Sequence, residues 1–211
     1  RDERPILITD ERGAERSGFD SRVDVHTVRA GAFMGQTAFG KAKGFASIAA
    51  GFWESRRLLK EIKPSVVVGF GGYPSLPTML SAIYARERTM IHEQNAVLGR
   101  VNRLLAPRVE SIAVAYMSTQ QLSPGTFGRV SVIGNPVRDA ISAVRAIPYS
   151  LPGDEGPFEL LIFGGSQGAA VFSDVVPRAL VELPKQHRSR LRVTQQCRPE
   201  DLERVREIYA T

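Results

Sequence analysis

The feature that most constrains the fold is an apolar run that ends abruptly in a glycine-rich turn, LLIFGGSQGAA at residues 160–170. A helix-compatible segment follows the turn. In α/β proteins this order places a phosphate at a helix N-terminus, because unpaired N–H groups of the first helical turn point at the anion. Glycine has no Cβ, so the backbone can approach the ligand closely. The same pattern also occurs in turns that bind nothing, and only the rest of the chain can separate these two interpretations.

The rest of the chain alternates strand-like and helix-like segments, which predicts an α/β fold with parallel sheets. We expect strands at 5–9, 23–28, 64–69, 89–91, 111–115, 130–133, 160–163 and 191–195, and helices at 41–63, 77–86, 97–105, 173–183 and 199–209. Right-handed crossovers bring the loops at the strand carboxyl ends to one rim, where ligands of open α/β sheets bind. Glycine-rich or polar residues occupy these loops at 71–73, 92–95, 135–138 and 164–168.

A linker-like stretch rich in proline and glycine divides the chain at 146–157. We therefore expect one α/β domain at 1–145 and the first part of a second one at 158–211. The length of 211 residues, with 43% hydrophobic and 24% charged residues, suits two small globular domains. The single cysteine, Cys197, excludes an internal disulfide, and no motif around it indicates a nucleophile.

The formal net charge of +6 favours an anionic partner such as nucleic acid, phospholipid or a phosphorylated substrate. No nucleic-acid-binding motif is present and the basic residues are scattered, so we expect no nucleic-acid partner. No apolar segment approaches the length of a transmembrane span. No aspartate-rich cluster indicates a metal site, and we expect neither a metal nor a cofactor.

The longest expected helix, at 41–63, carries both an apolar stripe and basic residues. One interpretation is an ordinary helix packed on a sheet. The other is a membrane-surface patch, with aromatic side chains in the interface and basic ones on anionic lipid. The candidates for such a patch are Lys41, Lys43, Phe45, Phe52, Trp53, Arg56 and Arg57. Periodicity does not decide between the two, because part of the stripe must be core in either case.

Four stretches together resemble one known family: GFGGYPS at 69–75, HEQN at 92–95 followed by Gly99 and Asn102, GNPVR at 134–138, and GGSQGA at 164–169. Their order and spacing are similar to those of the MurG family of glycosyltransferases, which make lipid II in peptidoglycan synthesis. The resemblance covers nearly the whole chain. RPED at 198–201 and the residues around Asp174 also look like the alphaproteobacterial branch of that family.

This resemblance implies a fold of two Rossmann-like domains of the GT-B type with a cleft between them. It implies transfer of N-acetylglucosamine (GlcNAc) from UDP-GlcNAc to the C4 hydroxyl of the N-acetylmuramic acid (MurNAc) unit of lipid I, with inversion. The enzyme would serve cell-wall biogenesis, and through it cell shape and division. It would work as a peripheral protein at the cytoplasmic face of the bacterial inner membrane, on an anionic lipid surface.

The resemblance also implies site residues. Those expected to contact UDP-GlcNAc are Asn95, Arg138 and Ser166, together with Gly165, Gln167 and Gly168 of the same turn. Those expected near the diphosphate of the acceptor are Gly71, Gly72 and Tyr73. A leaving UDP develops negative charge, which backbone donors at 164–168 and a fixed cation can stabilise without a metal. We expect Ser166 to face the cleft from a strand-to-helix turn, and His92 to orient neighbours rather than transfer a proton.

Two parts of the family pattern do not occur in this chain. The first strand of the N-terminal, acceptor-side domain and the glycine-rich loop whose histidine is needed for catalysis would lie before Arg1, so no catalytic residue is assigned. The distal half of the donor domain would lie after Thr211. We therefore expect both domains to be incomplete, the chain to be an internal piece of the enzyme, and this piece to be inactive alone.

Alternatives from other classes stay open. One is a different GT-B transferase or a UDP-sugar epimerase, which would share the glycine turns but not the pair of HEQN and GNPVR. Another is a non-catalytic module that binds a nucleotide sugar or another anion. A nucleic-acid binder is the third, motivated only by the net charge. Titration with UDP-GlcNAc and with an oligonucleotide separates these classes.

Overall fold

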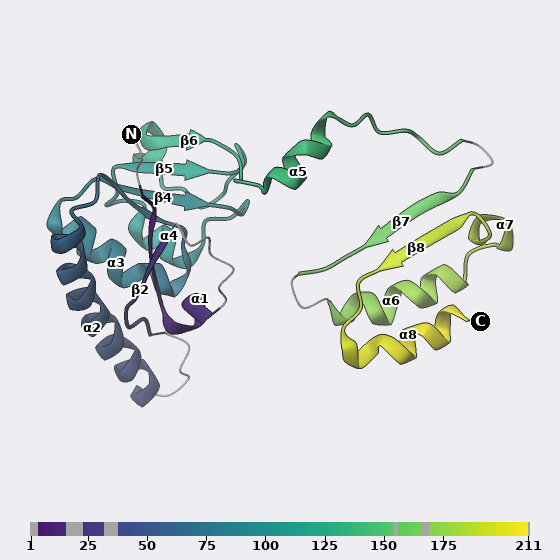
Figure 1. The fold of residues 1–211 in the computed structure, drawn as a ribbon, viewed down its shortest axis with the longest axis horizontal. Coiled ribbons are helices and arrows are strands. Elements are labelled where there is room, and N and C mark those ends of the chain that lie inside the picture. The colour runs from purple at the N-terminus through teal and green to yellow at the C-terminus, as the bar shows by residue number, and fades with distance from the viewer. Residues whose placement is uncertain (1–3, 16–22, 32–37, 154–155, 166–168, 211) are drawn as a thin grey trace. The chain divides into compact units, whose positions relative to one another are not determined.

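The computed structural model describes residues 4–15, 23–31, 38–153, 156–165 and 169–210 (Figure 1). The chain divides into two compact units, Arg1–Val137 and Arg138–Thr211. Every strand pair in the described residues is parallel, so the α/β fold with parallel sheets is confirmed. The expected domain boundary at 146–157 stays a prediction.

The first unit contains two parallel sheets and the helices that cover them. Its elements are β1 (Ile6–Thr9), α1 (Glu11–Glu15), β2 (Asp24–Thr27), α2 (Ala38–Ile62), β3 (Val67–Gly69), α3 (Gly72–Ala85), β4 (Thr89–Glu93), α4 (Arg100–Leu105), β5 (Ser111–Val114), the 3-10 helix η1 (Pro124–Arg129) and β6 (Val130–Val132). β1 pairs with β2, while β3, β4, β5 and β6 form a four-stranded sheet in that order.

The core of the first unit is formed by the four-stranded sheet and helices α2, α3 and α4; α3 contacts the sheet and packs against both other helices. Leu59, Met79 and Ile91 are almost fully buried there. Burial of each such side chain contributes on the order of 1.5–3 kcal/mol. The buried Ser55 of α2, which interrupts the apolar stripe, pairs its hydroxyl with that of Thr78 in α3 at 3.0 Å. Ser55 therefore interrupts the apolar stripe without leaving its buried hydroxyl unpaired, and its hydrogen bond links the two helices.

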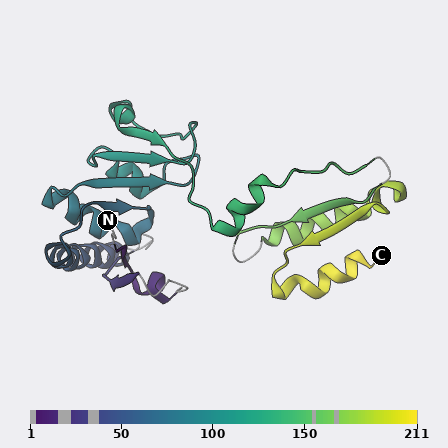
Figure 2. The ribbon, with the colours of Figure 1, turned by 45° about the horizontal axis from the view of Figure 1, so that its top comes forward.

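The second unit is built around one parallel strand pair. Its elements are α5 (Asp139–Ala143), the 3-10 helix η2 (Val144–Ala146), β7 (Phe158–Ile162), α6 (Ala170–Val181), α7 (Lys185–Arg188), β8 (Leu191–Gln195), the 3-10 helix η3 (Pro199–Asp201) and α8 (Leu202–Tyr209). β7 and β8 pair along their full lengths, with Leu160 opposite Val193. Both views place α6 and α8 on one side of this strand pair (Figure 1, Figure 2).

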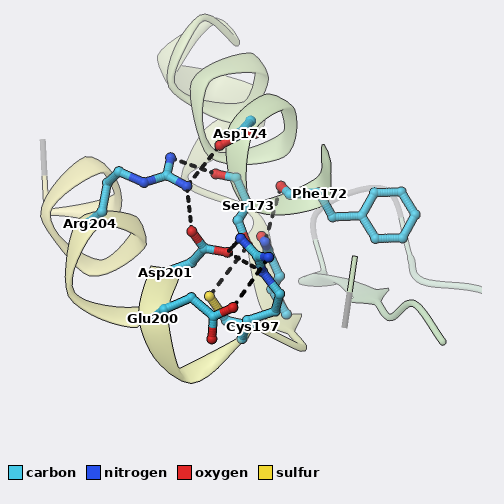
Figure 3. A network of polar contacts seen from close by, with 9 residues as sticks. Phe172, Ser173, Asp174, Cys197, Glu200, Asp201 and Arg204 are labelled. Carbon is cyan, nitrogen blue, oxygen red and sulfur yellow. Dashed lines mark hydrogen bonds and ion pairs between the residues drawn. The ribbon is translucent and has the colours of Figure 1, made fainter. Parts of the chain in front are cut away.

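A polar network around the buried carboxylate of Asp201 connects η3 and α8 to α6 (Figure 3). Arg198 Nε donates to Asp201 Oδ2 at 2.6 Å, and Arg204 Nη2 donates to Asp201 Oδ1 at 2.9 Å. The same Arg204 nitrogen reaches Asp174 of α6 at 2.8 Å. The hydrogen bonds from Arg204 and then Arg198 lower the pKa of Asp201 below its ordinary value. This network therefore fixes α8 against α6.

Several helices start at residues that the sequence pattern did not indicate; α2 and α6 begin at Ala38 and Ala170 rather than at 41 and 173. α3 begins at Gly72 rather than at 77, so Pro77 lies inside the helix, buried, and gives up one backbone hydrogen bond. α4 begins at Arg100 rather than at 97, because Val97 forms a bridge with Gln120 and keeps extended backbone there. The short helices α1, α5 and α7 were not expected, because four or five residues carry no readable periodicity.

Candidate functional site

The polar loops of the first unit follow the carboxyl ends of β3, β4 and β6, which belong to one parallel sheet. The loops after β4 and β6 are tied together. His92 Nε2 donates to the carbonyl oxygen of Gly134 at 3.0 Å, and Asn135 Nδ2 donates to that of Gln94 at 3.3 Å. The first residues of GNPVR therefore lie against HEQN.

His92 is buried at the end of β4, and protein groups engage both of its ring nitrogens. Gln94 Nε2 donates to Nδ1 at 3.0 Å, so the ring proton sits on Nε2, which donates to Gly134. The ring also packs 5.6 Å from that of Phe70, centroid to centroid. A neutral imidazole held on both sides orients the surrounding loops rather than offering a free acid or base.

Glu93 is a buried carboxylate at the same strand end, with only 2% of its surface exposed. Its Oε1 accepts the backbone N–H of Asn95 at 3.1 Å and the side-chain amide of Asn95 at 2.9 Å. Its Oε2 accepts the N–H of Gly99 at 2.8 Å and the side-chain amide of Asn102 at 2.9 Å. Burial alone would raise the pKa of Glu93, but these hydrogen bonds outweigh burial and lower the pKa below its ordinary value.

This arrangement fixes the orientation of the exposed Asn95 side chain. Its amide nitrogen points at Glu93, so its amide oxygen faces away from the carboxylate as a hydrogen-bond acceptor. A ligand at this position would meet an acceptor and would have to supply a donor, such as a sugar hydroxyl. Sequence reasoning assigned Asn95 to the site but missed Glu93, which holds it.

The turn before α3 packs on the buried Asn102 of α4. Gly71 has φ 80° and ψ −170°, a conformation open essentially only to glycine. A Cβ built at Gly71 would lie 3.0 Å from Asn102 Nδ2. Asn102 Nδ2 donates to Glu93 and to the carbonyl of His92, whereas Asn102 Oδ1 has no hydrogen-bond partner among the described residues. The glycine turn, HEQN and α4 therefore form one packed assembly.

The other two residues expected near the acceptor start helix α3. Gly72 has φ 71°, and its carbonyl accepts a hydrogen bond from the Ser75 hydroxyl at 3.0 Å. Arg12 of α1 donates to the Tyr73 hydroxyl, and its guanidinium carbon lies 5.2 Å from the centroid of the Tyr73 ring. Arg12 thus adds a cation beside this turn, which the sequence pattern gave no means of finding.

In the second unit, the residues expected to contact the nucleotide are exposed where they are described. Arg138 precedes α5 with its side chain exposed. The Gly164 N–H donates to Gln196 Oε1 at 3.0 Å, and Gly165 has open space where a Cβ would lie. Ser166, Gln167 and Gly168 lie outside the described residues. The predicted orientation of Ser166 therefore stays a prediction.

The α2 helix exposes an aromatic-basic surface, made of Phe52, Trp53, Arg56 and Arg57 with Tyr84 of α3. The Phe52 ring lies 5.4 Å from that of Trp53 and 5.8 Å from that of Tyr84, centroid to centroid. Trp53 is 63% exposed and Tyr84 69%. Arg56 lies over the Tyr84 ring at 5.5 Å. Lys43 and Phe45 are exposed earlier on the same helix, and the side chain of Lys41 lies outside the described residues. Tyr84 was missed by sequence reasoning.

The described residues contain no group of three or more His, Cys, Asp or Glu side chains placed to hold a metal ion. Among the described helices, none combines the length and apolar character needed to cross a membrane.

Comparison with known proteins gives consistent matches along the chain. The N-terminal domain of glycosyltransferase family 28 matches residues 2–114, and the C-terminal domain of the same family matches residues 159–211. A curated relative from Novosphingobium aromaticivorans is 50% identical over 97% of this chain, which spans about half (52%) of that relative. Its name is UDP-N-acetylglucosamine--N-acetylmuramyl-(pentapeptide) pyrophosphoryl-undecaprenol N-acetylglucosamine transferase.

Solved structures show the same fold. The crystal structure of Acinetobacter baumannii MurG superposes with a TM-score of 0.64 at 22% identity, covering 97% of this chain and 61% of that one. UDP-GlcNAc 2-epimerase from Methanocaldococcus jannaschii superposes with a TM-score of 0.51 at 13% identity, covering 96% and 67%. At these identities the similarity concerns the fold alone. The N-terminal domain of glycosyltransferase family 28 alone matches more than half of this sequence. The chain therefore belongs to glycosyltransferase family 28.

Proposed function

We propose that this chain is part of an inverting glycosyltransferase that moves GlcNAc from UDP-GlcNAc to the C4 hydroxyl of MurNAc in lipid I, which gives lipid II. The observation that carries the proposal is the 50% identity, over 97% of this chain, to a relative named as that transferase. The transferase works in peptidoglycan synthesis at the cytoplasmic face of the inner membrane.

In this proposal the residues named by the family resemblance contact the donor UDP-GlcNAc. The amide oxygen of Asn95 accepts a hydrogen bond from a sugar hydroxyl, because Glu93 holds the amide nitrogen. Arg138 and the turn at 164–168, including Ser166, Gln167 and Gly168, face the diphosphate. Backbone N–H groups and a guanidinium stabilise the negative charge that develops on the leaving UDP.

The acceptor lipid I is bound at the start of α3 in this proposal. Gly71 and Gly72 lie at the N-terminus of a 14-residue helix, where an anion is favoured. Tyr73 and the neighbouring Arg12 add a hydroxyl and a cation for a diphosphate.

Because the acceptor is a lipid, the enzyme must dock on a membrane, and we assign that docking to the aromatic-basic surface. Exposed aromatic rings such as Trp53 suit the interface, and arginines beside them face anionic headgroups. Each basic side chain contributes on the order of 1 kcal/mol near an anionic surface. Attachment of this strength is reversible and sensitive to salt.

A UDP-sugar epimerase is the second candidate, favoured only by similarity of fold. The transferase needs an acceptor and makes lipid II, whereas the epimerase needs no acceptor and makes an epimerised nucleotide sugar. We propose to incubate the transferase of which this chain is part with UDP-GlcNAc, with and without a lipid I analogue, and to separate the products by mass. Binding of UDP-GlcNAc with lipid II as the only product supports the transferase. An epimerised nucleotide sugar formed without acceptor, or binding of an oligonucleotide in place of UDP-GlcNAc, contradicts it.

A further inference from the structure

A polar cavity of about 550 Å³ lies in the first unit at the carboxyl ends of β1 and β2. Its volume falls within the range of roughly 300–1,000 Å³ that is typical of small-molecule sites. The turn into α1, the segment after β2 and the middle of α2 line it. Its charged lining residues are Asp10, Glu11, Arg12, Arg29 and Glu54. Among the described residues, the lining contains none of the site residues named by the family resemblance.

The segment after β2 is fixed on α2 at the wall of this cavity. A Cβ built at Gly51 of α2 would lie 1.8 Å from the carbonyl oxygen of Arg29, so only glycine lets the two backbones approach this closely. One helical turn further, Glu54 Oε2 accepts the backbone N–H of Arg29 at 2.8 Å. The backbone of Arg29 is therefore held on both sides, and its side chain starts from a defined position.

The two arginines of the lining keep hydrogen-bond donors that the neighbouring carboxylates do not use. Arg29 pairs through Nε with Glu54 Oε1 at 3.1 Å, and its two terminal nitrogens have no partner among the described residues. Arg12 pairs through Nη2 with Asp10 Oδ2 at 3.2 Å. A guanidinium carries five N–H donors in a fixed fork, so each arginine can bind a further acceptor.

Arg12 connects this cavity to the start of α3. The same side chain lines the cavity and donates to the hydroxyl of Tyr73, the second residue of that helix. The proposed function places the diphosphate of the acceptor beside Tyr73. The cavity therefore opens next to the proposed diphosphate site, and a part of the acceptor other than the diphosphate can reach it.

We propose that the cavity binds the C-terminal carboxylate of the peptide that the acceptor carries, with Arg29 as its main partner. This inference rests on the proposed function, because that function identifies the acceptor. The name of the Novosphingobium relative places a pentapeptide on the muramyl group. The amino end of this peptide is joined to the sugar through an amide, so the other end is a free carboxylate. Five extended residues reach about 16–18 Å from the sugar.

The charges of the lining select a carboxylate over a phosphate group. The lining contains three carboxylates and two guanidinium groups, so a doubly charged anion would be repelled more strongly than a singly charged one. A planar carboxylate can accept two parallel hydrogen bonds from the fork of Arg29. The hydroxyls of Thr27 and Ser47, also in the lining, can accept N–H groups from the last residues of the peptide.

The test compares two lipid I analogues that differ only at the C-terminus of the peptide, which is a free carboxylate in one and an amide in the other. The full-length transferase is used. We expect the KM of the amidated acceptor to be at least tenfold higher than that of the acid, with the same kcat and the same KM for UDP-GlcNAc. This comparison needs no variant, so it stands even where a substitution impairs folding.

Substitutions then assign the preference to Arg29. Arg29→Gln should give the two acceptors equal KM values, whereas Arg29→Lys should keep part of the preference because lysine retains the charge without the fork. Arg88→Gln is the matched control, since Arg88 is an exposed arginine that directly precedes β4, and it should keep the full preference. A merely structural role of Arg29 would change the KM of both acceptors equally.

Three results would overturn the inference while leaving the transferase assignment intact. They are lipid II formation with equal KM for both acceptors in the wild type, a preference for the acid that survives in Arg29→Gln, and a preference that is lost equally in Arg88→Gln. If neither acceptor yields lipid II, the proposed function itself is wrong and the inference fails with it.

Discussion

The carboxylate of Glu93 holds Asn95 by both its backbone N–H and its side-chain amide, at 3.1 Å and 2.9 Å to the same oxygen. Its second oxygen holds Gly99 and Asn102. One buried charge therefore decides the shape of the loop after β4 and the direction in which Asn95 presents its amide oxygen. The donor site that we propose depends on this relationship.

Glu93→Gln should destabilise the first unit and loosen the loop. Glutamine has nearly the same shape as glutamate, but an NH₂ group replaces one carboxylate oxygen. This NH₂ group would face the N–H donors whose hydrogen bonds that oxygen accepts in the wild type. Loss of charge-assisted hydrogen bonds at a buried site costs about 2 kcal/mol. Urea unfolding monitored by circular dichroism measures the change, with the exposed Glu110→Gln as control. Equal unfolding free energies for the two variants would contradict the role assigned to Glu93.

Gly71→Ala should disrupt the turn before α3. Alanine is strained at φ 80° and ψ −170°, by about 1–3 kcal/mol, and its Cβ would press on the Asn102 amide. Gly125→Ala is the matched control, because open space surrounds that glycine in η1. Thermal unfolding of both variants checks the prediction. If Gly71→Ala melts as late as Gly125→Ala, the turn tolerates a side chain and the argument from backbone strain is wrong.

Acid should loosen α8 only when the pH falls below the ordinary pKa of aspartate. The folded state lowers the pKa of Asp201 below its ordinary value of 3.8, so at pH values near 3.8 the unfolded chain binds more protons than the folded one. The stabilisation from Asp201 is therefore complete above that value and is lost as pH falls through the lower folded pKa. Hydrogen exchange at the Val205 amide follows α8 during the titration.

Asp201→Asn provides the control for this pH dependence, because asparagine does not titrate. In that variant the protection of Val205 should be lower at neutral pH and should change less with acid. Asp174→Asn removes the ion pair between Arg204 and the exposed Asp174 but keeps the one between Arg204 and Asp201. The protection of Val205 in this variant should therefore depend on pH nearly as it does in the wild type. An Asp201→Asn profile that parallels the wild-type profile would assign the pH dependence to other groups.

The aromatic-basic surface should bind anionic vesicles in a manner that depends on salt. Arg56→Glu with Arg57→Glu should weaken co-sedimentation at least about tenfold, since each basic residue contributes roughly 1 kcal/mol. Trp53→Ala should weaken it as well, by removing an aromatic side chain from the interface. Arg178→Glu with Arg188→Glu changes the net charge equally in the second unit and serves as control. If the control pair weakens binding as strongly, attraction by net charge alone explains the result.

The fold could be predicted from the sequence because buried parallel strands are continuous apolar runs. The strand expected at 191–195 is found as Leu191–Gln195, and the one at 111–115 as Ser111–Val114. Helix starts were less predictable, since the positive φ of Gly71 and the bridge at Val97 depend on neighbours distant in sequence. Such long-range contacts leave no periodic signal.

The sequence pointed to the candidate loops but not to the contacts within them. The family resemblance named Asn95 and the glycine turn as site residues, and that assignment stays a prediction. The role of Glu93 could not be predicted, because four hydrogen bonds from a folded loop define it. Tyr84 was missed for a similar reason: it joins Phe52 and Arg56 only when α2 and α3 pack together.

The most direct test of the central claim is an NMR titration of this chain with UDP-GlcNAc, which detects weak as well as tight binding. We expect shifts of the Asn95 side-chain amide and of the Gly164 and Gly165 backbone amides, and weaker shifts with the C4 epimer, UDP-GalNAc. Asn95→Ala and Arg138→Ala should each weaken binding, whereas Arg145→Ala, a nearby exposed arginine, should not. Absence of shifts at these amides, or binding indifferent to both substitutions, would contradict the proposed donor site.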